Sequence, residues 1–213
     1  MINLAASIVC YLAGMFIGNL GSQKEDERYM KELKGKGFLT FEILFMVAFL
    51  LMVNIFQDKN LIGDIFNICY LSIVAGLLSV SAYIDIKIQE LPDFNTVVFL
   101  AITILLMFIH KEDINIISQV LIVVISMAIY YVMSYFGGLG FGDVKLLLPI
   151  MISLDLLEVL NFWLYALMCA LIYVIPLAIY KKVKRQNIKG IKFAFGPYII
   201  IGFILFNIFG GLI

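Results

Sequence analysis

The chain has 213 residues, of which 63% are hydrophobic and only 14% are charged, and its formal net charge at pH 7 is zero. A soluble globular domain averages about 45–50% apolar and about 25% charged residues, so this composition excludes an ordinary water-soluble fold. The three cysteines, Cys10, Cys69 and Cys169, stand alone in apolar runs without a CxxC pair, which leaves a zinc ribbon or a disulfide scaffold without support.

A helix that crosses about 30 Å of hydrocarbon needs about 20 mostly apolar residues. Only helices and closed barrels satisfy their backbone groups in lipid, and the alternating pattern of a barrel is missing here. The sequence therefore predicts an all-α polytopic membrane protein. The expected spans, in chain order, lie near residues 2–20, 40–57, 64–85, 96–110, 114–136, 144–155, 158–180 and 194–213. The first run is too long for the apolar core of a signal peptide, so we expect it to be retained.

The basic residues give an independent test of these eight spans, because Lys and Arg collect in cytoplasmic loops. If the N-terminus lies outside, all but Lys59 and Lys111 of the 15 basic residues fall in or beside the inside loops. Those loops are 21–39, 86–95, 137–143 and 181–193. Without the short sixth span, which contains Pro149, the most basic loop would lie outside. The distribution therefore favours eight crossings, with both termini outside.

Two aspartates at the inner ends of spans are candidate functional residues, since charge within a membrane is costly. Asp85 ends the apolar run LLSVSAYID, and Asp143 follows a glycine-rich break that leads into the sixth span. The glycines of that break are Gly137, Gly138, Gly140 and Gly142. They allow another chain to approach closely. We expect the loop carboxylates, Glu25 and Asp26 among them, to be solvated, and Glu42 in the second span to be structural.

Asp85 and Asp143 form a chemically useful pair if the topology brings them together. Two carboxylates a few Å apart do not readily both ionise, so they share a proton. The charged one can act as general base on a water molecule, while the protonated one hydrogen-bonds the attacked carbonyl and protonates the leaving amine. Taken singly, each aspartate also fits a helix cap. Together on one membrane face, they favour catalysis.

Four sequence segments resemble a known family in its own order along the chain. GFGDVKLL, at residues 140–147, is similar to the GxGD signature of intramembrane aspartyl proteases as it occurs in type IV prepilin peptidases. LPD at 91–93 resembles the turn that follows the family's first catalytic aspartate, FAFGPYIIIG at 193–202 resembles the segment opening its last helix, and GMFIGNL at 14–20 is a looser match. The chain is thus identified as similar to this family over nearly its whole length.

This resemblance implies a single peptidase domain over residues 1–213, in the bacterial cytoplasmic membrane, with its active site facing the cytoplasm. The expected substrates are prepilins or pseudopilins, each with a basic leader and a hydrophobic helix, and no nucleic acid is expected as a partner. Carried over by position, Asp85 and Asp143 are the catalytic pair. The expected supporting residues are Gly140, Gly142, Lys145, Pro92, Asp93, Gly196 and Pro197.

The chain departs from longer family members in one respect. Their cysteine-rich, zinc-binding cytoplasmic domain is replaced here by the short loop 21–39, which has no cysteine. We therefore expect no metal or other cofactor, and neither zinc binding nor methyl transfer from S-adenosylmethionine. The charges of this loop, such as Glu27 and Lys31, are spaced for a short exposed helix.

Two other classes of function fit parts of the sequence. A small transporter or channel could use Asp85 and Asp143 as a proton or cation relay, but its carboxylates would line a path near the middle of the membrane. A non-catalytic assembly factor of a pilus or secretion machine would tolerate the loss of either aspartate. Assaying leader cleavage by Asp85→Asn and Asp143→Asn variants separates these classes.

Overall fold

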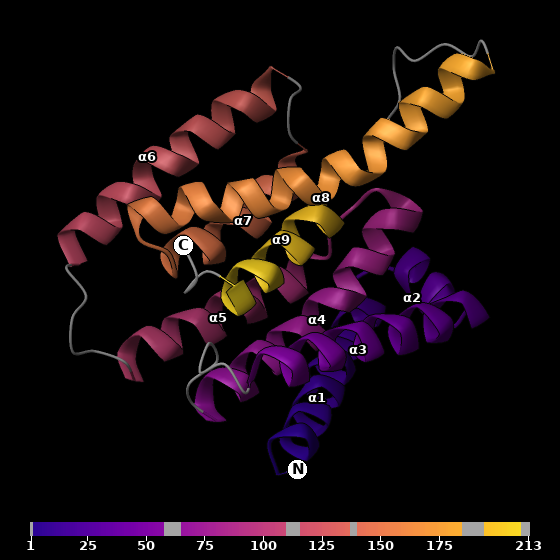
Figure 1. The fold of residues 1–213 in the computed structure, drawn as a ribbon, viewed down its shortest axis with the longest axis horizontal. Coiled ribbons are helices and arrows are strands. Elements are labelled where there is room, and N and C mark those ends of the chain that lie inside the picture. Colours follow the sequence, from indigo (N-terminus) through magenta and orange to yellow (C-terminus); the bar gives the residue numbers. More distant parts are fainter. Residues whose placement is uncertain (1, 58–64, 110–115, 137–139, 185–193, 210–213) are drawn as a thin grey trace.

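The computed structural model describes residues 2–57, 65–109, 116–136, 140–184 and 194–209, and every regular element in these ranges is an α-helix (Figure 1). The helices are α1 (Ile2–Glu25), α2 (Glu27–Leu33), α3 (Lys36–Gln57), α4 (Ile65–Ile88), α5 (Asp93–Ile109), α6 (Ile116–Tyr135), α7 (Phe141–Ile152), α8 (Leu156–Val183) and α9 (Gly196–Phe209). Apart from the short α2, each overlaps an expected span, although α1 and α3 extend into the expected loop 21–39, which is helical except at Asp26 and residues 34–35. The all-α expectation is confirmed for the described residues.

Five of these helices, α1, α3, α4, α6 and α8, are long and apolar enough to cross a membrane. Helices α5 and α9 are shorter apolar helices, and α7 has only 12 residues. The chain is thus a membrane protein by its helices, while the full count of eight crossings stays a prediction. Helix α7 also begins before the expected sixth span, so that Asp143 lies in its first turn.

Helix α4 is the centre of the bundle and packs against α1, α3, α5 and α9 (Figure 1). In the most apolar 18-residue stretch of α4, 67% of the residues are buried, against 17–28% in the corresponding stretches of the other four long helices. Its contact with α1 is close because it is made through glycine: a Cβ on Gly76 would overlap the backbone carbonyl of Tyr11, and one on Gly14 would overlap that of Ile73. Small residues at such positions let membrane helices approach closely.

Buried polar side chains hold further helices to this core. Glu42 of α3 is buried and its Oε2 accepts hydrogen bonds from the hydroxyl groups of Tyr11 (3.0 Å) and Ser79 (2.8 Å). This contact joins α1, α3 and α4, which agrees with the structural role expected for Glu42. On the other side of the bundle, the buried side chain of Gln119 on α6 donates to the backbone carbonyls of Met151, Ile152 and Leu154, at 2.8 to 3.2 Å. A helix end in an apolar setting needs such partners, so Gln119 explains how α7 can end inside the protein.

Candidate active site

Asp85 and Asp143 reach one cavity from two different helices. Asp85 lies in the last turn of α4 and Asp143 in the first turn of α7, and both side chains are buried, with 5% and 7% of their surface exposed. They line the same cavity of about 300 Å³ and lie close enough to interact electrostatically. The expectation that the two aspartates meet at one end of the bundle is therefore confirmed.

The two carboxylates have different electrostatic surroundings. Asp143 accepts a hydrogen bond from the backbone N–H of Gly140 (3.2 Å) at the N-terminus of α7, where the helix dipole favours a negative charge. Burial raises the pKa of Asp143, which lies outside the five spanning helices, to about 6, and the bond from Gly140 opposes that rise. Asp85 lies at the C-terminal end of α4, where the dipole disfavours an anion, and its buried Oδ2 accepts no hydrogen bond of regular geometry from the described residues, although the backbone N–H of Gly196 at the start of α9 approaches this carboxyl group.

Two glycines allow the backbone of α7 and α9 to lie close to Asp85 and the neighbouring Leu91. Gly196, the first residue of α9, lies so near that an added Cβ would stand 2.6 Å from Oδ2 of Asp85 and 3.3 Å from Leu91. A Cβ on Gly142, in the first turn of α7, would also meet Leu91 at 3.3 Å. Leu91 thus packs against the starts of both α7 and α9. Pro197 follows as a buried residue in the first turn of α9, where its missing N–H costs no helical hydrogen bond.

Lys145 and Asp93, expected as separate supporting residues, form an ion pair at the edge of the cavity. The Nζ of Lys145 lies 2.8 and 2.9 Å from the two carboxylate oxygens of Asp93. This pair ties the start of α5 to α7. Pro92 is buried just before Asp93, in the loop that leads from Asp85 to α5. All nine expected site residues thus lie in or beside one cluster, whereas Gly137 and Gly138 lie outside the described residues.

The short loop 21–39 contributes more to this cluster than the sequence indicated. It contains α2, which confirms the expected short helix, and Glu25 just before α2 accepts hydrogen bonds from the backbone N–H groups of Asp93 (2.9 Å) and Phe94 (3.1 Å), at the start of α5. Glu25 also lines the cavity. Glu25 is exposed, as expected for a loop charge, but the unpaired amides at the N-terminus of α5 also bind its carboxylate, which the sequence did not predict.

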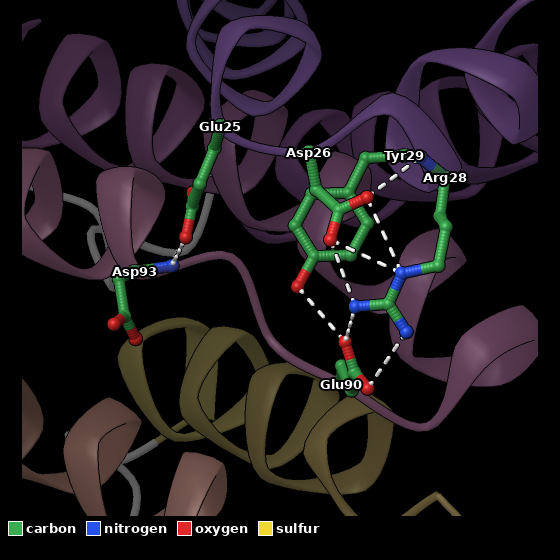
Figure 2. A network of polar contacts seen from close by, with 6 residues as sticks. All are labelled: Glu25, Asp26, Arg28, Tyr29, Glu90 and Asp93. Carbon is green, nitrogen blue, oxygen red and sulfur yellow. Dashed lines mark hydrogen bonds and ion pairs between the residues drawn. The ribbon is translucent and has the colours of Figure 1, made fainter.

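A second set of contacts joins α2 to the loop 89–92 (Figure 2). The guanidinium of Arg28 binds the carboxylate of Glu90 through two nitrogens, at 2.7 and 3.1 Å, and also binds Asp26 at 2.8 Å. Asp26 caps α2, and its bonds with Arg28 hold the pKa of the Asp26 carboxyl below its usual range. Asp26 is thus partly exposed, as expected for a loop charge, and is also paired, which the sequence did not predict. Burial raises the pKa of Tyr29 to about 12, so its hydroxyl stays neutral and donates to Glu90 (3.4 Å).

Gln89 turns the chain from α4 into this loop. Its φ of 60° lies in the left-handed region, which costs a non-glycine residue about 1 kcal/mol or more, and its N–H donates to the carbonyl of Asp85 (2.9 Å). The turn directs Glu90 towards Arg28 and Leu91 towards the glycines. No sequence pattern predicted these contacts, apart from the helical spacing of the charges in α2.

A family model described as the type IV leader peptidase family matches residues 71–175. The chain belongs to this family. The match runs from α4 into α8 and includes both aspartates of the cavity, and it confirms the resemblance that the sequence motifs indicated. Comparison with curated proteins and with solved structures gave no match.

Membership of the type IV leader peptidase family implies that the chain is a protease. The cavity offers two carboxylates with unlike surroundings, and Gly140, Gly142 and further acidic residues also line it. Among the described residues that line it, Glu25, Glu90 and Asp93 are acidic and Lys145 alone is basic. Glu90 is paired with Arg28 and Asp93 with Lys145, which leaves the two buried aspartates and Glu25 without a cation partner among the described residues. Such a lining is complementary to a positively charged peptide segment.

Proposed function

We propose that this leader peptidase family member is an aspartic endopeptidase embedded in the bacterial cytoplasmic membrane. It removes the basic leader of prepilins or pseudopilins at the cytoplasmic face, using Asp85 and Asp143. The observation that carries the proposal is that these two buried carboxylates, 58 positions apart in sequence, line one cavity. Family membership supports the peptidase class, and the acidic residues that line the cavity support a basic leader as substrate.

The surroundings of the two carboxylates support a division of roles. Asp143, at a helix N-terminus with a donor on its carboxylate, is the ionised member and takes a proton from the attacking water. Asp85, at a helix C-terminus with no regular hydrogen bond to its Oδ2 from the described residues, is the protonated member and hydrogen-bonds the oxygen of the scissile carbonyl. Hydroxide then adds to the carbonyl carbon.

The collapse of the tetrahedral intermediate breaks the C–N bond. One proton passes from the carboxyl pair to the leaving nitrogen, which leaves the pair singly protonated and ready for the next cycle. The mechanism balances with water as the only co-reactant, so it calls for no metal and no cofactor. Because Gly140, Gly142 and Gly196 have no Cβ, the starts of α7 and α9 can lie close against the two carboxyl groups and Leu91.

The basic residues of α2 lie at the same end of the bundle as the cavity, since Arg28 binds the loop next to Asp85. Under the rule that basic loops face the cytoplasm, this supports cleavage on that side. It also disfavours a proton or cation relay, whose carboxylates would follow a path through the membrane. The carboxylates here share one cavity at one end.

The proposal is tested with purified protein in detergent and a prepilin that bears its leader. We expect cleavage by the parent and a loss of at least about 10³-fold in Asp85→Asn and in Asp143→Asn, since each variant lacks the shared proton chemistry. Glu42→Gln is the matched control: it makes the same carboxyl-to-amide change at a buried site outside the cavity and should cleave at close to the parent rate. Parent-like cleavage by both aspartate variants would exclude the mechanism.

A further inference from the structure

A second and larger cavity, of about 590 Å³, lies between α5, α6 and α7. Helices α5 and α6 each pack on α7, which forms its floor. Its lining side chains repeat at helical spacing on each helix and are mostly apolar. They include Val97, Leu100, Met127, Tyr131, Val144 and Leu148. We call this cavity the α5–α7 groove.

The open side of the groove exposes large apolar side chains. Val97 is 62% exposed and Tyr131 is 60% exposed, although both line the concave surface. A cylinder of about 10 Å diameter, the width of a helix with its side chains, would fill this volume over about 8 Å of length, which corresponds to about five residues. The groove is thus large enough for a turn or more of an apolar helix.

The α5–α7 groove is continuous with the cavity of the two aspartates. Asp93, Phe141 and Lys145 line both. The Nζ of Lys145 also lies 5.4 Å from the centre of the Phe141 ring, so these side chains form one wall between the two spaces. On one side of the wall the lining is acidic, and on the other side it is apolar.

This order of surfaces fits a substrate in which a basic segment, a scissile bond and an apolar helix follow one another. We propose that the α5–α7 groove binds the first turns of the apolar helix that follows the scissile bond, an inference that rests on the proposed function. Bound there, the helix would place the bond before it at the wall, next to Asp85 and Asp143, with the basic leader in the acidic cavity. The groove would thereby determine which peptide bond is cut.

Photo-crosslinking tests this inference without requiring turnover. Asp143→Asn protein, which should bind but not cleave, would carry benzoylphenylalanine at position 97 in the groove, or at position 105 as the control. Leu105 lies on the same helix, is similarly exposed (61%) and is absent from the groove lining. With the uncleaved prepilin we expect a crosslink from position 97 to the first turns of the apolar helix, and at least tenfold less from position 105. Crosslinks to lipid alone, to a second copy of the chain, or equally from both positions would overturn the inference.

Cleavage assays separate a failure of the groove from a failure of the proposed function. In otherwise wild-type protein, Val97→Trp should reduce kcat/KM for a full prepilin at least tenfold, mainly through KM. It should leave the cleavage of a short peptide that lacks the apolar helix unchanged, and Leu105→Trp should resemble the parent on both substrates. Equal rates of Val97→Trp and parent on the full prepilin would refute the groove while leaving the peptidase intact. Crosslinking from position 97 of the Asp143→Asn protein, together with no cleavage of either substrate by the parent, would instead refute the proposed function.

Discussion

Gly196→Ala tests how closely the start of α9 fixes the Asp85 carboxylate. The added Cβ would stand 2.6 Å from Oδ2 of Asp85, whereas real Cβ contacts are essentially never under 3.0 Å. The carboxyl group or the helix must therefore move by at least 0.4 Å. Because Oδ2 is at the tip of a short side chain, rotation of the carboxyl group relieves most of the overlap. The displaced atom, however, is the one that must face the scissile carbonyl.

The size of the expected losses in stability and in rate depends on which atoms the added methyl group displaces. Inserting a methyl group into a packed site costs about 1–3 kcal/mol in the free energy of unfolding, and a side chain that can rotate keeps the cost near the lower limit. A misplacement of about 1 Å at a reacting group can cost about 10²-fold in rate. We therefore expect Gly196→Ala to lower kcat by about 10- to 100-fold and the free energy of unfolding by about 1 kcal/mol.

Gly202→Ala, on the same helix, is the matched control. Its added Cβ would also stand 2.6 Å from its nearest atom, but that atom is Cα of Ala166 on α8, a backbone atom that cannot rotate away. Gly202→Ala should thus lose more stability, up to about 3 kcal/mol, while its folded fraction keeps kcat close to that of the parent. The assays are prepilin cleavage under saturating substrate and unfolding of the detergent-solubilised protein. Parent-like kcat in Gly196→Ala, or equal kcat losses in both variants, would refute the reasoning.

Three further outcomes follow from the structure. Arg28→Ala removes the ion pair with Glu90, so it should lower cleavage measurably, by up to about tenfold, through a looser cavity wall while leaving stability nearly unchanged, as expected for an exposed pair; unchanged cleavage would contradict this. Gly76→Ala should destabilise the protein by about 2 kcal/mol or more in unfolding assays, because the methyl group would overlap the backbone carbonyl of Tyr11, and parent-like stability would contradict the close α1–α4 contact. The cleavage rate should fall as the pH drops through about 6, since Asp143 then gains a proton and no longer acts as base; a flat rate between pH 7 and pH 5 would exclude this role.

The sequence predicted which residues gather around Asp85 and Asp143 because the parts of this candidate site carry local signals. Asp85 was predicted because it is a charged residue at the end of an apolar run. Asp143 was predicted because it follows a glycine-rich break and precedes an expected span. The resemblance then placed LPD and FGP beside them. The structure brings these segments together in one cluster around the two carboxylates. Lys145 and Asp93 were both expected there, although no pattern predicted that they would form an ion pair.

What the sequence could not predict depends on contacts between distant segments. Glu25 looks like one more charge in a polar loop, and only the fold shows that its carboxylate binds the first amides of α5. The contact of Arg28 with Glu90, 62 positions away, is of the same kind. The α5–α7 groove is likewise invisible in hydropathy, since a lipid-facing surface and a groove for an apolar helix have the same composition.

The measurement that most directly tests whether Asp85 and Asp143 work as one unit is a comparison of the two single Asn variants with the double variant in single-turnover cleavage of prepilin. Residues that act as a unit are strongly non-additive. If the carboxyl pair shares one proton, the double variant should be no slower than either single variant, because the first substitution already removes the mechanism. A double variant slowed by the product of the two single losses, or a single variant that still cleaves at the parent rate, would contradict it.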